Sequence, residues 1–293
     1  MVNYCVQSKV NVNSQLLSDL TCGNRKDRIG ICRRDCAMVY DATTTRIFHL
    51  SPYSFFSVIG IVCASSVFIL LELKYGYRIP RYTKLFFLSG LGMLAGARFF
   101  GYLTGLFIAL ANNEPVTLET FKNTGIVFYG GVIGFILSFL LLCKIWYKKI
   151  EHGVLDIVIV CIPLFHFWGR LGCFFGGCCY GIETQLPFSV LYTTFINDEV
   201  VTASRVPVQL VEASLNILLF LFLLNLLNIG LFRDNLVKVY FFFYAILRII
   251  LEFFRGDFVR GIWRGVTFSQ VISIIILLFF LISMFVKKEG INV

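Results

Sequence analysis

Four charged side chains interrupt segments that are otherwise almost entirely apolar. Arg98 and Arg170 each lie within such a segment. Arg248 and Glu252 lie four residues apart in another one. A charged side chain at the centre of a bilayer costs roughly 2.5–3.5 kcal/mol on insertion scales, so it usually faces a partner or polar space. These positions are therefore the first candidates for a functional site.

The arginines favour phosphate chemistry. Guanidinium groups bind phosphate through paired hydrogen bonds, and the phosphate most available to a membrane protein belongs to a lipid headgroup. Arg248 and Glu252 share one helical face and could simply neutralise each other, but one Glu cannot neutralise several arginines. The pattern predicts a phospholipid site near the outer leaflet, where the predicted topology gathers Arg170, Arg205, Arg255 and Arg264.

Three cysteines follow Arg170 closely, at Cys173, Cys178 and Cys179. They could be small apolar fillers, a disulfide or other redox-sensitive pair, or a nucleophile or metal site. Adjacent cysteines on one backbone rarely point the same way, which makes this spacing poor for zinc. The sequence leaves these readings open, and we expect no metal site and no cofactor.

The elements that carry these residues are long apolar segments. Of the 293 residues, 58% are hydrophobic and 15% are charged, and the mean hydropathy is +0.81, which excludes an ordinary soluble domain. A helix needs about 20 residues to cross a bilayer. We therefore predict an all-α, polytopic membrane protein with seven transmembrane helices at Tyr53–Leu73, Leu85–Ala111, Gly125–Tyr147, Val154–Phe175, Val208–Leu227, Leu236–Phe254 and Val266–Phe285.

Basic residues between these segments indicate the orientation, because cytoplasmic loops are enriched in Lys and Arg. One side carries Lys74, Arg78, Arg81, Lys84, Lys144, Lys148, Lys149, Arg233, Lys238, Lys287 and Lys288, and the other carries Lys122, Arg205, Arg255, Arg260 and Arg264. We expect the N-terminus outside and the C-terminus in the cytoplasm, although Arg33, Arg34 and Arg46 run against this. The net charge of +9 reports orientation rather than binding of nucleic acid.

Three regions are expected along the chain: a polar N-terminal extension at 1–48, a seven-helix domain at 49–286 and a cytoplasmic tail at 287–293. The extension shows no signal peptide. It could be disordered, could form two disulfides or could bind zinc through Cys5, Cys22, Cys32 and Cys36. A translation start at Met38 would remove most of it.

Glycines recur at four-residue spacing at Gly92 and Gly96 and at Gly130 and Gly134. Small residues at this spacing let membrane helices approach closely, so we interpret them as packing positions. The run Gly169–Gly181 is too rich in glycine for a regular helix end. It is expected to form a turn that lines a cavity, as irregular backbone at membrane depth must.

The run Gly169–Gly181 also resembles the signature of the prolipoprotein diacylglyceryl transferases, Gly-Arg-x-Gly-Asn-Phe-x-Asn-x-Glu-x-x-Gly. The resemblance continues in order over about residues 50–286. Its further landmarks are Tyr53 before Gly60, Gly96–Tyr102, Tyr129-Gly130-Gly131, Asp156 before Pro163, Pro207-x-Gln209-x-x-Glu212, Arg248-x-x-x-Glu252-x-x-Arg255 and Thr267-x-x-Gln270-x-x-Ser273.

The resemblance implies seven helices in a bacterial inner (cell) membrane, with the N-terminus outside. It implies transfer of a diacylglyceryl group from phosphatidylglycerol to the lipobox cysteine of a preprolipoprotein signal peptide, with release of glycerol phosphate. Arg170 and Arg248 would bind the lipid phosphate, Glu252 would orient Arg248, Gly181 would leave space for substrate and Tyr53 would line the site. Further substrate contacts are expected from Arg98, Cys173, Cys178, Glu212 and Arg255.

The chain departs from the family pattern at the residues closest to the chemistry. The family's histidine is Tyr129 here, its two asparagines are Cys173 and Gly176, and its glutamate is Cys178. Thioether formation needs a thiolate, hence a base or an electropositive site. Candidate bases are Tyr129 and His166, which lies one helical turn before Arg170, although His166 could equally be a satisfied core residue.

Three functions remain open from the sequence. The first is the family reaction, with Arg170, Arg248, Glu252, Tyr129 and His166 as catalytic residues. The second is a related lipid transferase with another acceptor. The third is a phospholipid-binding membrane protein without catalysis, which the missing His, Asn and Glu would suit.

Overall fold

The computed structural model describes residues 39–41, 50–77, 81–112, 115–116, 125–148, 150–196, 199–256, 262–263 and 266–289. Several residues used in the sequence analysis lie outside these ranges. They are Cys5, Cys22, Cys32 and Cys36 of the N-terminal extension, together with Arg33, Arg34, Met38, Arg46, Arg78, Lys122, Lys149, Arg260 and Arg264.

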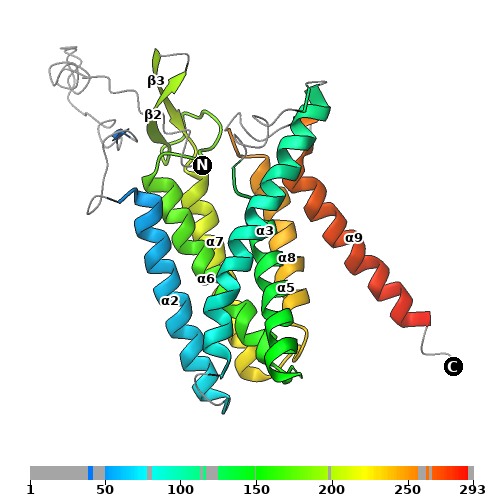
Figure 1. The fold of residues 1–293 in the computed structure, drawn as a ribbon. Helices are drawn as coiled ribbons and strands as arrows, with labels where there is room; N and C mark the ends of the chain where they lie inside the picture. Colours follow the sequence, from blue (N-terminus) through cyan, green and yellow to red (C-terminus); the bar gives the residue numbers. More distant parts are fainter. Residues whose placement is uncertain are drawn as a thin grey trace.

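Within the described ranges, seven helices occupy the predicted apolar segments (Figure 1). They are α2 (Pro52–Lys74), α3 (Arg81–Asn112), α5 (Phe128–Tyr147), α6 (Val154–Phe175), α7 (Val208–Ile229), α8 (Leu236–Glu252) and α9 (Phe268–Glu289). The first five of these are long and apolar enough to cross a membrane. Helix α8 has 17 residues, and α9 is apolar over Phe268–Phe280. The prediction of a helical chain is confirmed.

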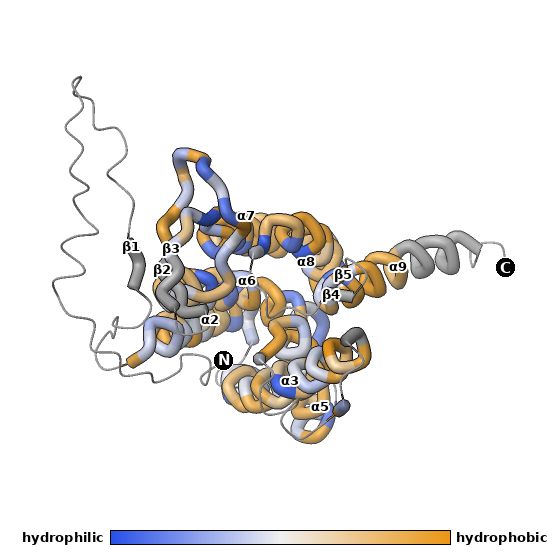
Figure 2. The backbone as a smooth tube through the Cα atoms, turned by 90° about the horizontal axis from the view of Figure 1, so that it is seen from above, coloured by the Kyte–Doolittle hydropathy of each residue, from blue (hydrophilic) through white to orange (hydrophobic). Residues whose placement is uncertain are grey.

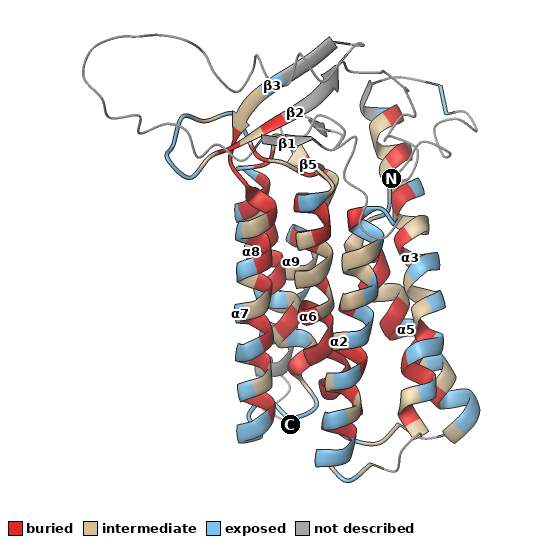
Figure 3. Cartoon of the chain, turned by 90° about the vertical axis from the view of Figure 1, so that its left-hand side faces the viewer, coloured by how far each residue is buried: buried red, intermediate tan, exposed pale blue. Residues whose placement is uncertain are grey.

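Helix α6 lies at the centre of the described helices, packed against α2, α7 and α8 (Figure 2). Most of its side chains are buried, which suits a segment that is apolar all round. The outer helices instead turn large apolar side chains outward, for example Leu70 at 63% exposure and Leu94 at 66% (Figure 3). An apolar exterior around a packed interior is typical of helices surrounded by lipid.

Close packing of α3 on α5 depends on glycine, as the four-residue spacing predicted. A Cβ added to Gly96 would lie 2.2 Å from the carbonyl oxygen of Gly130, and one added to Gly134 would lie 2.3 Å from that of Gly92. Such distances are impossible for a side chain, so the two backbones touch only because these positions are glycine.

Two buried carboxylates fix helix ends far from the predicted site. Glu72, at the end of α2, accepts hydrogen bonds from the backbone N–H of Tyr82 and the hydroxyl of Thr83 at the start of α3. Asp156, in the first turn of α6, accepts from the backbone N–H groups of Asp234 and Leu236 before α8. Both satisfy helix N-terminal donors that would otherwise be unpaired.

A small sheet covers the other end of the helices (Figure 1). Strands β2 (Val190–Ile196) and β3 (Glu199–Arg205) form an antiparallel hairpin with Val190 opposite Arg205, and β1 (Val39–Asp41) pairs with β2 in parallel. Strands β4 (Ile262–Trp263) and β5 (Val266–Thr267) form a second pair. The all-α prediction is wrong at these strands: the segment between α6 and α7 was read only as a loop, and β5 takes the place predicted for the start of the last helix, which begins at Phe268.

Candidate active site

Glu212 of α7 is the centre of a buried charged cluster. Its Oε1 lies 3.0 Å from Arg170 Nη2 and 3.5 Å from His166 Nε2, both on α6. Its Oε2 lies 3.8 Å from Arg248 Nη1 on α8. The side chain of Glu212 is 2% exposed, so one carboxylate joins three helices in a low-dielectric interior.

Arg248 has a second carboxylate partner on its own helix. Its Nη2 lies 2.8 Å from Glu252 Oε2 and donates a longer hydrogen bond, 3.4 Å, to Ser269 Oγ of α9. Its Nη1 is buried and forms no hydrogen bond among the described residues, since Glu212 Oε2, at 3.8 Å, is too far away for one. Two arginines thus face two glutamates, and the excess of arginine expected from the sequence is absent from this quartet.

The ring of His166 contacts three neighbouring side chains. Its Nε2 accepts a hydrogen bond of 3.1 Å from Arg170 Nε, one turn further along α6. Its ring stacks on Phe128 with centroids 3.6 Å apart and meets the edge of Tyr244. Since a guanidinium always donates, the Nε2 lone pair is engaged and the remaining proton of a neutral ring belongs on Nδ1.

Tyr129, which takes the place of the family's histidine, lies at the start of α5 and is 2% exposed. Its hydroxyl is 2.7 Å from Ser273 Oγ of α9, and its ring contacts the edge of Tyr244. Ser273 in turn donates to the carbonyl of Ser269. The phenol therefore ties α5 to α9 beside the charged cluster.

The three thiols converge, contrary to the expectation that adjacent cysteines diverge. Helix α6 continues through Gly172 to Phe175, so Cys173 is helical, and only the segment after it forms the turn that carries Cys178 and Cys179. The three sulfur atoms lie within 4.8 Å of one another. Cys179 has a φ of +62°, a left-handed conformation that reverses the chain locally.

The polar environment of this turn distinguishes Cys179 from its neighbours. The thiols of Cys173 and Cys178 form hydrogen bonds with Cys179 and lower the pKa of its thiol well below the usual value. Gln209 of α7 donates 2.7 Å to the carbonyl of Cys178 and accepts from Tyr192 of β2. The turn is therefore anchored to α7 and to the hairpin.

Gly181 closes the site against two other segments. Its N–H donates to Val206, a Cβ there would lie 2.5 Å from that same carbonyl oxygen, and Gly181 also forms a bridge with Arg255. A Cβ on Gly256 would lie 2.3 Å from the Gly181 carbonyl oxygen. These contacts bring the segment after α8 beside the thiol turn, with Arg255 buried between them.

Tyr53 and Arg98 lie at the margin of this assembly. Tyr53, at the start of α2, packs its backbone on Gly172 and interacts electrostatically with Arg170 and the three thiols. Arg98 of α3 contacts Tyr102, one turn along, by a 3.3 Å hydrogen bond and over its ring. The other predicted site residues come from five helices, α2, α5, α6, α7 and α8, and from the turns after α6 and α8.

Comparison with known proteins decides the family. The family description "Prolipoprotein diacylglyceryl transferase" matches residues 42–286. The chain belongs to the prolipoprotein diacylglyceryl transferase family. It is 31% identical over 235 residues to the phosphatidylglycerol–prolipoprotein diacylglyceryl transferase of Clostridium tetani, covering 78% of this chain and 90% of the relative. It is 29% identical to transferase 2 of Clostridium perfringens (79% and 90%) and 30% identical to that of Wolbachia from Brugia malayi (78% and 89%).

Membership of the transferase family and the apolar helices identify a multi-pass membrane protein. Glu212 is more central to this transferase-family site than its sequence position indicated. Glu212 was expected only among the substrate contacts, yet it joins Arg170, His166 and Arg248. The signal was present, because Gln209, Glu212 and Asn216 recur on one face of an apolar helix, and all three are buried.

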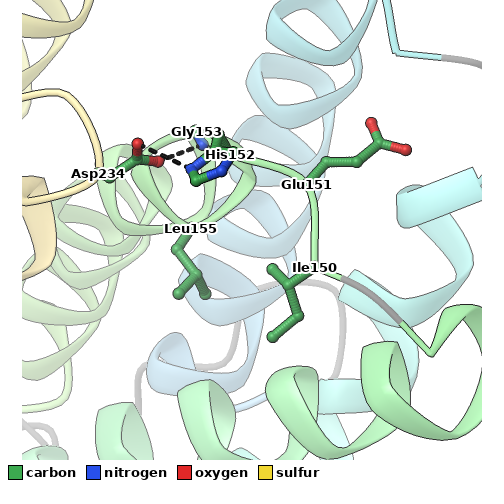
Figure 4. Close-up of a pocket in the computed structure, with 6 residues that line it drawn as sticks. All are labelled: Ile150, Glu151, His152, Gly153, Leu155 and Asp234. Carbon is green, nitrogen blue, oxygen red and sulfur yellow. Dashed lines mark hydrogen bonds and ion pairs between the residues drawn. The ribbon is translucent and has the colours of Figure 1, made fainter.

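A separate pocket lies far from the charged cluster and is lined by none of the predicted site residues. It lies where α6 begins and is lined by Ile150, Glu151, His152, Gly153, Leu155 and Asp234 (Figure 4). Asp234 accepts from the N–H of Gly153 and lies 3.2 Å from His152 Nδ1. The pocket is roughly 30 Å from the thiols, measured along α6 at 1.5 Å of rise per residue.

Proposed function

We propose that this chain is a phosphatidylglycerol:prolipoprotein diacylglyceryl transferase. It moves a diacylglyceryl group from phosphatidylglycerol to the lipobox cysteine thiol of a preprolipoprotein signal peptide and releases glycerol phosphate. The observation that carries the proposal is the buried cluster on Glu212, in which Arg248 Nη1 is left without an aligned partner. A buried guanidinium donor with no aligned hydrogen bond is suited to a phosphate oxygen.

Arg170 and Arg248 bind the phosphodiester in this proposal. As the bond from the glyceryl carbon to oxygen breaks, the phosphate gains a negative charge, and fixed guanidinium groups stabilise that charge more than the ground state. Glu212 and Glu252 are positioning residues, which hold the two arginines by contacts of 3.0 Å and 2.8 Å. Their negative charges also make two buried guanidinium groups tolerable before lipid binds.

The remaining site residues divide between the two substrates. Tyr53, Arg98 and Arg255 contact the lipid or the peptide, whereas the space expected at Gly181 is taken up by Val206 and Val208, so Gly181 serves close packing of the turn instead. Cys173 and Cys178 lie beside the incoming acceptor. Tyr129 and His166 are the side chains proposed as the base, because each adjoins the charged cluster.

The proposed topology follows from the same family membership. All seven helices cross the bacterial inner membrane, with the N-terminus outside and the C-terminus cytoplasmic, and residues 49–286 form the transferase domain. Lys74 and Lys144 lie at the ends of α2 and α5, on the side assigned to the cytoplasm. The thiol turn and the β2–β3 hairpin then lie toward the outer leaflet.

Reconstitution tests the proposal directly. Purified protein in phosphatidylglycerol vesicles should add the mass of one diacylglyceryl group to a lipobox peptide, and a peptide with Ser in place of the lipobox Cys should gain none. Vesicles without phosphatidylglycerol should give no product. Intact membrane protein that transfers nothing to any lipobox peptide, and that does not rescue a strain depleted of its own transferase, would overturn the proposal.

A non-catalytic phospholipid binder is the second candidate, and one observation favours it. The quartet of Arg170, Arg248, Glu212 and Glu252 is balanced in charge and could be a structural core. In that case phosphatidylglycerol would bind to the reconstituted protein without turnover. A related transferase acting on another thiol would instead consume phosphatidylglycerol when small thiols replace the peptide.

A further inference from the structure

The three thiols of Cys173, Cys178 and Cys179 converge, and the proposed function gives them no chemical role. Cys173 lies in the last turn of α6, while Cys178 and Cys179 follow in the turn after it, and no two of the three sulfur atoms are more than 4.8 Å apart. Cys173 and Cys179 are buried and Cys178 is half-buried. All three are free thiols in the described structure.

The local backbone removes the usual obstacle to a metal site at adjacent cysteines. Gly177 adopts a φ of +63° and Cys179 a φ of +62°, so two residues of this turn have left-handed backbone conformations. A left-handed conformation at a non-glycine residue is uncommon and costs free energy. Here it directs the thiols of Cys178 and Cys179 toward Cys173 instead of to opposite sides.

The spacing suits a thiophilic cation. A Zn–S bond is about 2.3 Å long, so sulfur atoms on one tetrahedral zinc ion are about 3.8 Å apart. The present separations need to contract by no more than about 1 Å to reach that value. Three thiolates and one open position are the arrangement of a zinc site that binds a further ligand rather than a closed structural site.

The chemistry at this site creates a need for such a ligand position. The acceptor must react as a thiolate, yet both side chains proposed as a base are already engaged. His166 Nε2 accepts from Arg170, and the Tyr129 hydroxyl is bonded to Ser273. A zinc ion ionises a coordinated thiol without any protein base, because a coordinating thiol is deprotonated outright.

We propose that Cys173, Cys178 and Cys179 bind a zinc ion whose fourth position takes the sulfur of the acceptor cysteine. The proposal rests on the proposed function, since it names how that reaction obtains its nucleophile. Cys178, the most exposed of the three, marks the side from which the peptide enters. Tyr53 lies close to these thiols at the start of α2, and the residue is 37% exposed.

The step balances in atoms and charge. The three protein thiols lose their protons to water when zinc binds, and the acceptor thiol loses its proton to water when its sulfur joins the metal. A sulfur lone pair then forms the C–S bond to the glyceryl carbon. The C–O bond breaks with its electron pair on the phosphate oxygen, so glycerol phosphate leaves as a dianion. The neutral thioether is a weak ligand and departs.

The charged cluster is adjacent to this zinc position, as a two-substrate reaction requires. Arg170 interacts electrostatically with Cys173, Cys179 and Glu212. One guanidinium therefore lies between the proposed nucleophile site and the proposed phosphate site. A displacement at the glyceryl carbon needs the nucleophile and the phosphate held close together, and Arg170 lies near both proposed sites.

Cobalt substitution tests the site without relying on activity. Because the N-terminal extension has its own cysteines, the full chain is prepared with Cys5, Cys22, Cys32 and Cys36 replaced by Ser. Co(II) should bind at about one ion per chain with strong thiolate-to-cobalt charge-transfer absorption. Cys173→Ser, Cys178→Ser and Cys179→Ser should each lose that absorption. Cys63→Ser, a half-buried cysteine of α2 outside the triad, should keep it.

Addition of the lipobox peptide then tests the fourth position. The peptide should shift the cobalt spectrum, and the same peptide with Ser in place of Cys should not. Absence of thiolate absorption in the reduced protein, a disulfide among the three cysteines that persists under reduction, or equal cobalt binding by the triad variants would overturn the proposal.

The two proposals fail separately. Transfer to the peptide in protein shown to be free of metal would overturn the zinc site and leave the proposed function intact. Stoichiometric thiolate-bound cobalt together with no transfer to any lipobox peptide would overturn the function, and the metal site would stand. Restoration of transfer by zinc after chelation, in Cys63→Ser but in none of the triad variants, supports both.

Discussion

Buried carboxylates occur in two regions of this molecule and have different partners in each. Asp156, where α6 begins, accepts two backbone N–H groups, and Glu72 accepts one together with a hydroxyl. Glu212, toward the other end of the helices, faces guanidinium and imidazole groups, and one neighbouring donor, Arg248 Nη1, has no aligned partner. The backbone donors beside Glu72 and Asp156 are satisfied, whereas beside Glu212 two buried side-chain donors, Arg248 Nη1 and His166 Nδ1, form no hydrogen bond among the described residues.

This difference separates a structural role from a chemical one. A carboxylate that accepts from helix N-termini stabilises the chain, and nothing remains for a ligand to bind. A guanidinium held by carboxylates but incompletely bonded is costly in the free protein and gains partners when an anion arrives. Substitutions near Glu212 should therefore lower activity, and substitutions near Asp156 should lower stability.

The largest loss of activity is expected from substitutions around Glu212. Arg248→Ala and Arg170→Ala should each reduce diacylglyceryl transfer at least about 100-fold, because a fixed donor for developing charge is lost. Arg81→Ala is the matched control, since Arg81 also pairs with a glutamate, Glu151, but in the other region. Transfer is measured by mass spectrometry of the peptide. Full activity in either site variant, with protein present in the membrane, contradicts the phosphate site.

A substitution at Asp156 should have the opposite result, a loss of stability without a loss of activity. Asp156→Ala removes the acceptor of two backbone N–H groups and should lower the free energy of unfolding by about 1–3 kcal/mol. Activity per folded molecule should stay within about twofold of the parent. Thermal unfolding in detergent measures the first and transfer per intact molecule the second. Loss of activity without loss of stability would show that Asp156 acts on the chemistry and would break the comparison.

The next effect concerns stability alone, at the contact between α3 and α5. Gly96→Ala should destabilise the protein by about 1–3 kcal/mol, since its Cβ would lie 2.2 Å from the Gly130 carbonyl oxygen and must push the helices apart. Gly90→Ala on the same helix is the matched control, because a Cβ there meets nothing within 4 Å. A stability equal to the control would show that α3 and α5 pack less closely than described.

The sequence predicted the helices well because the bilayer imposes their length and composition. It also predicted that Arg248 and Glu252 could pair, because a separation of four residues places them on one helical face. The joining of α6, α7 and α8 by Glu212 was not predictable in the same way, since contacts between helices depend on how each rotates about its axis.

The strands and the thiols show two other limits. Val190–Ile196 is rich in β-branched and aromatic residues, which is a strand signal, but the helical pattern around it led to a loop assignment. The left-handed φ of Cys179 carries no signal in the sequence, because glycine and asparagine are the residues usually found there. The convergence of adjacent thiols therefore required the structure.

The smallest loss of activity is expected for Tyr129→Phe. Its size tests whether Tyr129 acts as the base in place of the family's histidine. Tyr129→Phe removes the hydroxyl bonded to Ser273 but leaves Ser273 donating to the Ser269 carbonyl. Transfer should therefore fall less than about tenfold, because the phenol holds α5 near α9 and the acceptor thiolate forms elsewhere. A loss of about 100-fold to 10,000-fold is the size expected for a general base. That result would show that Tyr129 removes the proton from the acceptor thiol and that the three cysteines do not activate it.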